Sequence, residues 1–118
     1  MKSILVVEDD EALGYMLVRH LQVAGYDATG VTSTMAALTM LDAKPEIALV
    51  LADLVMPKGQ PNGLALGRMA RMRRQDMKLV FITGYDLEFG DLPLPGRLFR
   101  KPLDVPALLS EVGTLLSD

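Results

Sequence analysis

One stretch decides the fold predicted for this chain, the run Ile47-Ala48-Leu49-Val50-Leu51-Ala52-Asp53. Six apolar residues in succession, without polar alternation, are typical of a strand that helices cover on both faces of a parallel sheet. The run ends on Asp53, a carboxylate that is costly to bury unless it is paired or lies in a cleft. The sequence therefore predicts a central strand with a candidate site residue at its carboxyl end.

Three other apolar runs end on residues that can bind a metal ion or an anionic group. They are residues 4–7 before Glu8-Asp9-Asp10, residues 79–82 before Thr83, and residues 98–100 before Lys101-Pro102. In an open α/β sheet, ligands bind outside the carboxyl ends of the strands, where the strand order reverses. If the runs lie parallel, three carboxylates, a hydroxyl and an ammonium group meet in one crevice.

Helical periodicity alternates with these runs, which indicates βαβ units with right-handed crossovers. The expected helices end before Gly25, run from the cap Ser33 to about residue 43, run from the cap Asn62 to about residue 74, and follow the cap Asp104. A weaker strand is expected over residues 26–31. Between Thr83 and Lys101, two prolines and three glycines leave room for only a short or irregular fourth helix.

Length and composition place the chain among small globular domains. At 118 residues it is one domain long, and half of its residues are hydrophobic. A net charge of −3 offers no general attraction for nucleic acid or an anionic membrane. No run is long enough to cross a bilayer, and the start is too short for a signal peptide, so a cytoplasmic location is expected. The basic cluster at residues 68–74 is interpreted as a solvated helix end, with docking of an acidic partner as the alternative.

The adjacent acids Glu8, Asp9 and Asp10 exceed what a helix cap requires, although Asp10 suits that role. Clustered carboxylates repel one another unless a cation neutralises them. Hard oxygen ligands favour Mg²⁺, which bridges to phosphate oxygens. A nucleotide or flavin site is disfavoured, because three acids in this position would repel a bare phosphate. The lone His20 is interpreted as a partly buried packing residue.

Thr83 and Lys101 supply the remaining chemistry. A hydroxyl donor and a point charge are what the other oxygens of a phosphoryl group require. Each residue alone is a weak signal, because a threonine often ends a strand and a lysine is usually solvated. The ordered set of acids, hydroxyl and ammonium group is a strong one.

These residues resemble the receiver domain of bacterial two-component response regulators over essentially the whole chain. The matching segments are Ile4-Leu5-Val6-Val7-Glu8-Asp9-Asp10, Leu51-Ala52-Asp53-Leu54-Val55-Met56-Pro57, Ile82-Thr83-Gly84 and Lys101-Pro102. The resemblance implies a single receiver domain over residues 1–118. It also implies a flavodoxin-like, doubly wound sheet of five parallel strands in the order 2-1-3-4-5.

The same resemblance implies how the site residues act. Asp53 would accept a phosphoryl group from a histidine kinase or a histidine phosphotransfer protein, with Thr83 as the switch hydroxyl and Lys101 paired with the phosphoryl group. The implied metal ion is Mg²⁺. Its implied ligands are Asp9, Asp53 and the backbone carbonyl of Val55, with Glu8 acting through water.

The expected protein is a switch rather than an enzyme, with self-catalysed phosphoryl transfer, slow autodephosphorylation and phosphorylation-dependent contacts with an unknown downstream protein. The alternative is an interaction module whose binding ignores phosphorylation. A phosphatase or phosphotransferase is disfavoured, because those aspartate-nucleophile enzymes usually carry a second aspartate two residues on, where this chain has Val55.

Three features depart from the family pattern. The loop over residues 56–63 is about two residues longer than usual, and Leu98 stands where an aromatic residue is usual, three before Lys101. The stretch Phe81-Ile82-Thr83-Gly84-Tyr85 resembles single-domain receivers with a degenerate fourth helix. Val55 and Tyr85 are bulky and cannot orient a water as a carboxylate or an amide would, so a long-lived phosphoryl state is expected. It would act by ordering residues 84–96, with Tyr85 both shielding the phosphoryl group and holding the ordered segment.

Overall fold

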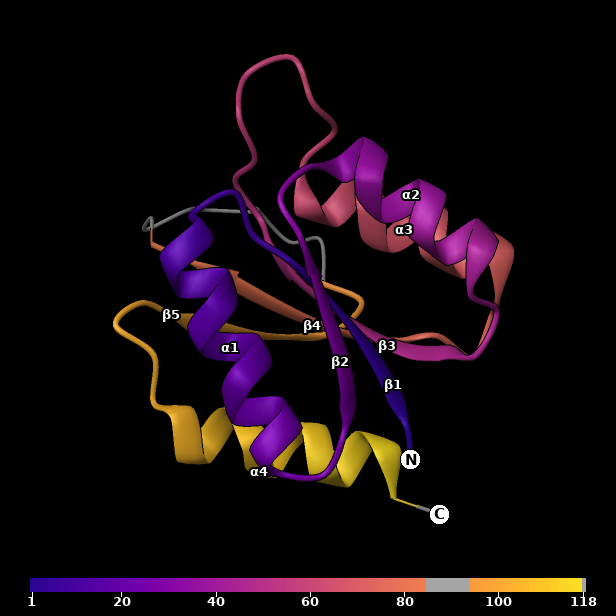
Figure 1. The fold of residues 1–118 in the computed structure, drawn as a ribbon. Coiled ribbons are helices and arrows are strands. Elements are labelled where there is room, and N and C mark those ends of the chain that lie inside the picture. The colour runs from indigo at the N-terminus through magenta and orange to yellow at the C-terminus, as the bar shows by residue number, and fades with distance from the viewer. Residues whose placement is uncertain (85–93, 118) are drawn as a thin grey trace.

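The protein is represented by a computed structural model that describes residues 1–84 and 94–117. Strands and helices alternate along most of the chain (Figure 1). In chain order the elements are β1 (Ser3–Val7), α1 (Glu11–Val23), β2 (Asp27–Val31), α2 (Thr34–Ala43), β3 (Ile47–Asp53), α3 (Gly63–Arg73), β4 (Lys78–Thr83), β5 (Arg97–Arg100) and α4 (Val105–Leu116). Among these residues, no helix is long and apolar enough to cross a membrane.

All five strands form one parallel sheet in the order β2-β1-β3-β4-β5. This order confirms the predicted doubly wound fold. The predicted fourth helix and the proposed role of Tyr85 fall on residues 85–93, which lie outside the described part of the chain. The strand order reverses between β1 and β3, so the predicted crevice lies at the carboxyl ends of these two strands.

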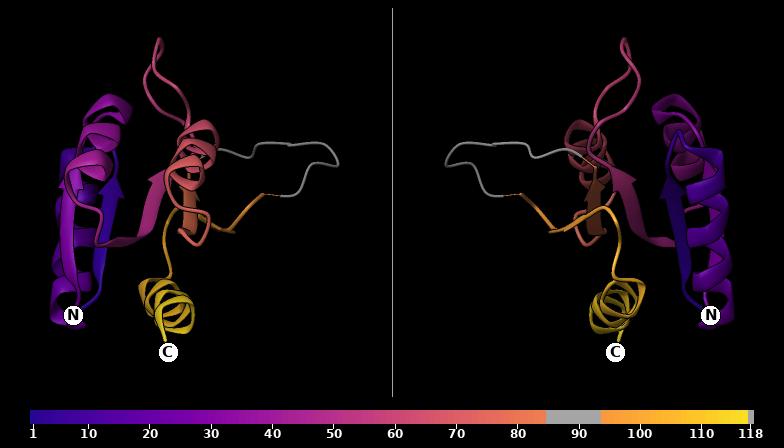
Figure 2. Two further views of the ribbon diagram at one scale, coloured as in Figure 1. Left: turned by 90° about the vertical axis from the view of Figure 1, so that its right-hand side faces the viewer. Right: turned by 90° about the vertical axis from the view of Figure 1, so that its left-hand side faces the viewer.

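Helices cover both faces of the sheet, with α2 and α3 on one side and α1 and α4 on the other (Figures 1 and 2). In β3, Val50 and Ala52 pack against the α2/α3 layer, while Leu49 and Leu51 pack against the α1/α4 layer. Side chains of a strand alternate between its two faces. The continuous apolar run in β3 therefore reflects a strand that is buried on both sides, as predicted.

The helices begin at the predicted caps. Side-chain oxygens of Asp10, Ser33, Asn62 and Asp104 each accept a hydrogen bond from the backbone N–H three residues on, at 2.8–3.1 Å. Each bond satisfies one of the donors that the first turn of a helix leaves without a partner. Gly25, at a φ of 101°, follows α1 in the left-handed conformation that favours glycine.

Helix α3 begins in direct contact with the end of β3. The Gly63 N–H donates to the Leu54 carbonyl at 3.0 Å. A Cβ atom at Gly63 would lie 2.2 Å from the carbonyl oxygen of Asp53, so only glycine fits there without a shift of the backbone. This contact fixes the first turn of α3 against the backbone of the candidate site residue.

The interpretation of His20 was wrong, and that of the basic cluster was incomplete. His20 is exposed, because Leu17 and Leu21 take the buried positions of α1 and residue 20 lies about 100° around the helix from residue 21. The basic cluster lies at the end of α3 with Arg68 and Arg73 exposed, as interpreted, but some of its arginines also have partners within the protein. Arg73 pairs with Asp42 at 2.6 Å, and Arg74 donates to backbone carbonyls, including that of Ile47.

Candidate functional site

Residues from the ends of β1 and β3 and from the loop after β5 meet at one point. The Lys101 Nζ atom lies 2.7 Å from Glu8 Oε1 and 2.7 Å from Asp53 Oδ2. The Glu8 and Asp53 side chains are 0 % and 6 % exposed, and that of Lys101 is 27 % exposed. One ammonium group thus bridges two buried carboxylates, which are costly to bury without a partner.

Both oxygens of Asp53 have a hydrogen-bond donor. Oδ2 accepts from Lys101, and Oδ1 accepts from the backbone N–H of Val55 at 2.9 Å. The N–H of Leu54 is bonded to the Ile82 carbonyl at 2.8 Å, which holds the chain beyond Asp53 against β4. The carboxylate is therefore fixed in direction by its own strand, by the following loop and by the lysine.

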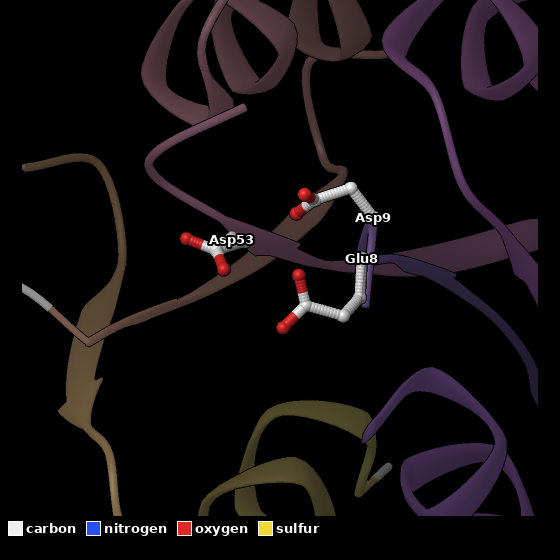
Figure 3. Close-up of side chains that lie close together, drawn as sticks. All are labelled: Glu8, Asp9 and Asp53. Atoms are coloured by element: carbon white, nitrogen blue, oxygen red, sulfur yellow. The ribbon is translucent and has the colours of Figure 1, made fainter. Parts of the chain in front are cut away.

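A third carboxylate completes a cation-binding arrangement. One oxygen each of Glu8, Asp9 and Asp53 lie within 4.8 Å of one another. Figure 3 shows Glu8 and Asp9 side by side at the end of β1, with Asp53 nearby on β3. Three carboxylates outnumber the single lysine, and Glu8 Oε2 is buried without a hydrogen-bond partner among the described residues. An all-oxygen donor set with excess negative charge suits a hard divalent cation such as Mg²⁺.

The cluster faces a cavity of about 340 Å³. Its lining residues are Glu8, Asp9, Asp10, Asp53, Val55, Met56, Pro57 and Lys101. Asp9, Asp10 and Pro57 are exposed at its rim, whereas Glu8 and Asp53 are buried. A ligand can therefore approach from the rim and reach the Asp53 carboxylate.

Glu8 is the acid whose protonation the site alters most. Burial raises the pKa of the Glu8 carboxyl from 4.5 to about 7, and the neighbouring Asp53 raises it as well, while Lys101 opposes both. Burial alone would lower the pKa of Lys101. Hydrogen bonds and charge attraction from Asp53 and Glu8 outweigh that effect and raise it. The lysine therefore stays protonated in the folded protein at neutral pH.

The raised pKa of Glu8 predicts that the metal-free protein loses stability as pH rises. The folded state holds the Glu8 proton more tightly than the unfolded chain, so this contribution is fully present below a pH of about 4.5 and is lost as pH rises through about 7. We expect the free energy of unfolding in EDTA to fall by on the order of 2–3 kcal/mol between pH 4.5 and pH 8. Urea unfolding at a series of pH values measures this change.

Glu8→Gln keeps the shape of the protonated acid and is expected to flatten this pH dependence. Glu46→Gln, at an exposed position before β3, removes one acid elsewhere and is the matched control. An equally steep pH dependence in Glu8→Gln and in the control would contradict the assignment of the effect to Glu8.

The remaining predicted residues lie beside this group. In the sheet, Asp53 is level with Ile82, and Thr83 follows one residue later with a fully buried side chain. The Thr83 carbonyl accepts from the Lys101 N–H at 2.8 Å. As far as the described residues define it, the cavity lining includes Val55 but not Thr83. The structure thus places Glu8, Asp53 and Lys101 in direct contact, with Asp9 and Val55 around the cavity and Thr83 buried at the end of the neighbouring strand β4.

Two interactions at this site were not predicted from the sequence. The first is the contact between Lys101 and Glu8, because lysine was expected to face a phosphoryl group alone. The second joins the loop after β3 to α2, where the Thr34 N–H donates to Gln60 Oε1 at 3.0 Å. No sequence pattern around Thr34 or Gln60 predicts a contact between residues that are 26 positions apart.

A parallel sheet in this order, with a carboxylate cluster and a lysine at the reversal of strand order, defines the class of protein. The sequence model of the family described as the response regulator receiver domain matches residues 4–90 of this chain. The chain belongs to this family. It is therefore a receiver of two-component signalling, a family whose members histidine kinases phosphorylate.

Individual relatives and one solved structure agree with this assignment. The response regulator receiver protein CpdR of Brucella abortus (strain 2308) is 33% identical, over 98% of this chain and 98% of CpdR. The sensor kinase CckA of the same organism is 31% identical over 92% of this chain, which matches 13% of the kinase. The crystal structure of the response regulator TrrA from Thermotoga maritima, in complex with Mg(2+)-BeF, has a TM-score of 0.85 and 28% identity, covering 98% of this chain and 100% of TrrA.

Proposed function

We propose that Asp53 is the phosphoacceptor of this receiver and that it takes its phosphoryl group from the phosphohistidine of a kinase or a phosphotransfer protein. One observation carries the proposal. The Asp53 carboxylate is held between the Val55 N–H and the Lys101 ammonium group, at the floor of a cavity that opens to solvent. A buried carboxylate that is fixed in direction and reached through a rim is suited to act as a nucleophile.

Asp9, Asp53 and the backbone carbonyl of Val55 would hold Mg²⁺, with Glu8 assisting through water. When bound, the ion neutralises carboxylate charge and orients the oxygens of the incoming phosphoryl group. The clustering of three carboxylate oxygens within 4.8 Å supports this proposal, as does the likeness to a structure that was solved with Mg(2+)-BeF. The buried Glu8 Oε2, without a partner among described residues, adds an acceptor for an ordered water.

The phosphoryl transfer then proceeds by in-line displacement. An Asp53 oxygen forms a bond to phosphorus as the bond from phosphorus to the imidazole nitrogen of the donor breaks, and that nitrogen keeps the electron pair. The Lys101 Nζ atom lies 2.7 Å from Asp53 Oδ2 before the transfer. During the transfer its ammonium group pairs with the phosphoryl oxygens, where negative charge develops. The Thr83 hydroxyl lies at the end of the neighbouring strand, and it donates to another of these oxygens once the phosphoryl group is in place.

In this proposal the chain is a switch that catalyses its own modification. Val55, at the cavity wall, has no polar side chain to orient an attacking water, which favours slow hydrolysis of the acyl phosphate. Phosphorylation then changes contacts with an unidentified downstream protein, and nucleic acid and membrane take no part. We further propose a single domain over residues 1–118 and a cytoplasmic location.

The test uses small phosphoryl donors, which remove any dependence on a protein partner. Acetyl phosphate with Mg²⁺ is expected to add the mass of one phosphoryl group to the protein, and peptide mapping is expected to place it on Asp53. EDTA is expected to prevent the addition. An unmodified protein with saturating acetyl phosphate, and likewise with a panel of phosphohistidine donors, would contradict the proposal and favour an interaction module that works without phosphorylation.

A further inference from the structure

The loop between β3 and α3 comprises residues 54–62, and backbone hydrogen bonds hold its two ends close together beside the site. The Leu54 N–H bonds to the Ile82 carbonyl, and the Leu54 carbonyl accepts from Gly63 at 3.0 Å. In Figures 1 and 2 the loop projects beyond the end of the sheet that carries Asp53. A loop with neighbouring ends and a free middle has many conformations unless something holds its middle.

A tight turn shapes the tip of this loop. The Gln60 N–H donates to the Pro57 carbonyl at 3.1 Å. Gly59, at a φ of 92°, occupies the third position of the turn, where a type II turn requires a positive φ. The turn directs the Gln60 side chain back toward α2.

The second half of the loop, at residues 60–61, is fastened to the first residue of α2. Gln60 Oε1 accepts from the Thr34 N–H at 3.0 Å, and the Thr34 Oγ1 donates to the Pro61 carbonyl at 2.8 Å. We call this pair of bonds the Thr34–Gln60 latch. Thr34 is fully buried, so its hydroxyl is satisfied by the loop rather than by water.

The same loop supplies one wall of the candidate site. Val55, Met56 and Pro57 line the cavity, and they lie between the fixed start of the loop at Leu54 and the latch at Gln60. The chain from 55 to 59 is therefore held on both sides. The start of the wall is also held by the Val55 N–H bond to Asp53 Oδ1 and by the burial of Met56 in the core. Without the Gln60 contact, the first fixed point after Met56 moves on to Pro61, and the far side of the wall gains conformational freedom.

We infer that Gln60 is a positioning residue, which holds the Val55–Pro57 wall in the conformation that binds the divalent cation. The inference rests on the proposed function, because the carbonyl of Val55 is the ligand that the wall presents. When only a fraction of the protein has the conformation that binds a ligand, the apparent dissociation constant is the intrinsic one divided by that fraction. The latch thus acts on cation affinity from outside the cavity.

Three variants separate this role from general stability. Gln60→Ala removes the acceptor without changing charge, whereas Gln60→Glu keeps an acceptor of the same length and places a negative charge at the start of α2, where a helix favours it. Lys58→Gln changes the charge of the loop by the same amount as Gln60→Glu, at an exposed residue outside the latch.

Two readouts on metal-free protein and on protein titrated with Mg²⁺ are needed. In Gln60→Ala we expect the dissociation constant for Mg²⁺ to rise by about three- to tenfold, the effect of losing one hydrogen bond. Exchange of the backbone amides of residues 55, 56 and 58–60 in EDTA is expected to accelerate by a similar factor, with exchange of the core strand β3 unchanged. Gln60→Glu and Lys58→Gln are expected to resemble the wild type in both measurements.

The outcomes distinguish this inference from the proposed function. Wild-type binding of Mg²⁺ with unchanged affinity in Gln60→Ala would overturn the positioning role and leave the receiver chemistry intact. If Gln60→Glu binds Mg²⁺ as weakly as Gln60→Ala does, the positioning role is also overturned. No binding of Mg²⁺ by the wild type would overturn both.

Discussion

Asp53→Asn is expected to abolish phosphoryl labelling while preserving the fold. Asparagine has the shape of aspartate, and its carbonyl oxygen can still accept from the Val55 N–H, which lies 2.9 Å from Asp53 Oδ1. The amide has no nucleophilic oxyanion, so we expect the rate of labelling by acetyl phosphate to fall by at least about a hundredfold. Intact-mass spectrometry over a time course measures the rate.

The matched control is Asp104→Asn, which makes the same chemical change at the cap of α4. Asparagine is as good a cap as aspartate, so this variant should be labelled at the wild-type rate. Asp53→Asn should also lower the pKa of Glu8, because the charge of Asp53 raises it. Labelling of the Asp53→Asn protein at a rate near that of the control would show that another residue is the acceptor.

Lys101→Met is expected to impair both stability and chemistry. The variant keeps much of the side-chain volume but leaves Glu8 and Asp53 buried without the ammonium group that lies 2.7 Å from each. Removing one partner of a buried ion pair leaves an uncompensated charge. We expect the free energy of unfolding of metal-free protein at pH 8 to fall by about 2–4 kcal/mol, and phosphoryl transfer to slow by about a hundredfold or more.

Acidification and Mg²⁺ should each restore part of the lost stability, because each reduces the repulsion between the two carboxylates. Lys78→Met removes a positive charge from an exposed position at the start of β4, so it tests for an effect of net charge alone. Chemical unfolding at pH 5 and pH 8, with EDTA or Mg²⁺, gives the comparison. If Lys101→Met is as stable as Lys78→Met under all four conditions, the bridge between the carboxylates contributes nothing to the fold.

The fold was predictable because its local signals agree. The six apolar residues before Asp53 favour a strand with helices on both sides, and β3 is such a strand. Caps such as Ser33 and Asn62 mark helix starts through their own hydrogen bonds, which depend on neighbours three residues away. Signals of this kind need no knowledge of tertiary structure.

The grouping of site residues was predictable, but their contacts with one another were not. Parallel strands bring Glu8, Asp53 and Lys101 to one edge of the sheet, as the order of the runs predicted. That Lys101 bridges both acids depends on side-chain packing, which periodicity does not encode. His20 was misplaced for a related reason: a helix of 13 residues has an apolar stripe whose edge is set by the tertiary contacts of Leu17 and Leu21.

The contact of Gly63 with the Asp53 carbonyl has a mechanical consequence. No side chain separates the first turn of α3 from the backbone of Asp53, the proposed phosphoacceptor, since a single added carbon would lie 2.2 Å from that oxygen. The backbone of Asp53 and the first turn of α3 are therefore in direct van der Waals contact. Helix α3 therefore touches the end of β3 directly, and a displacement of the Asp53 backbone is expected to displace the first turn of α3 as well.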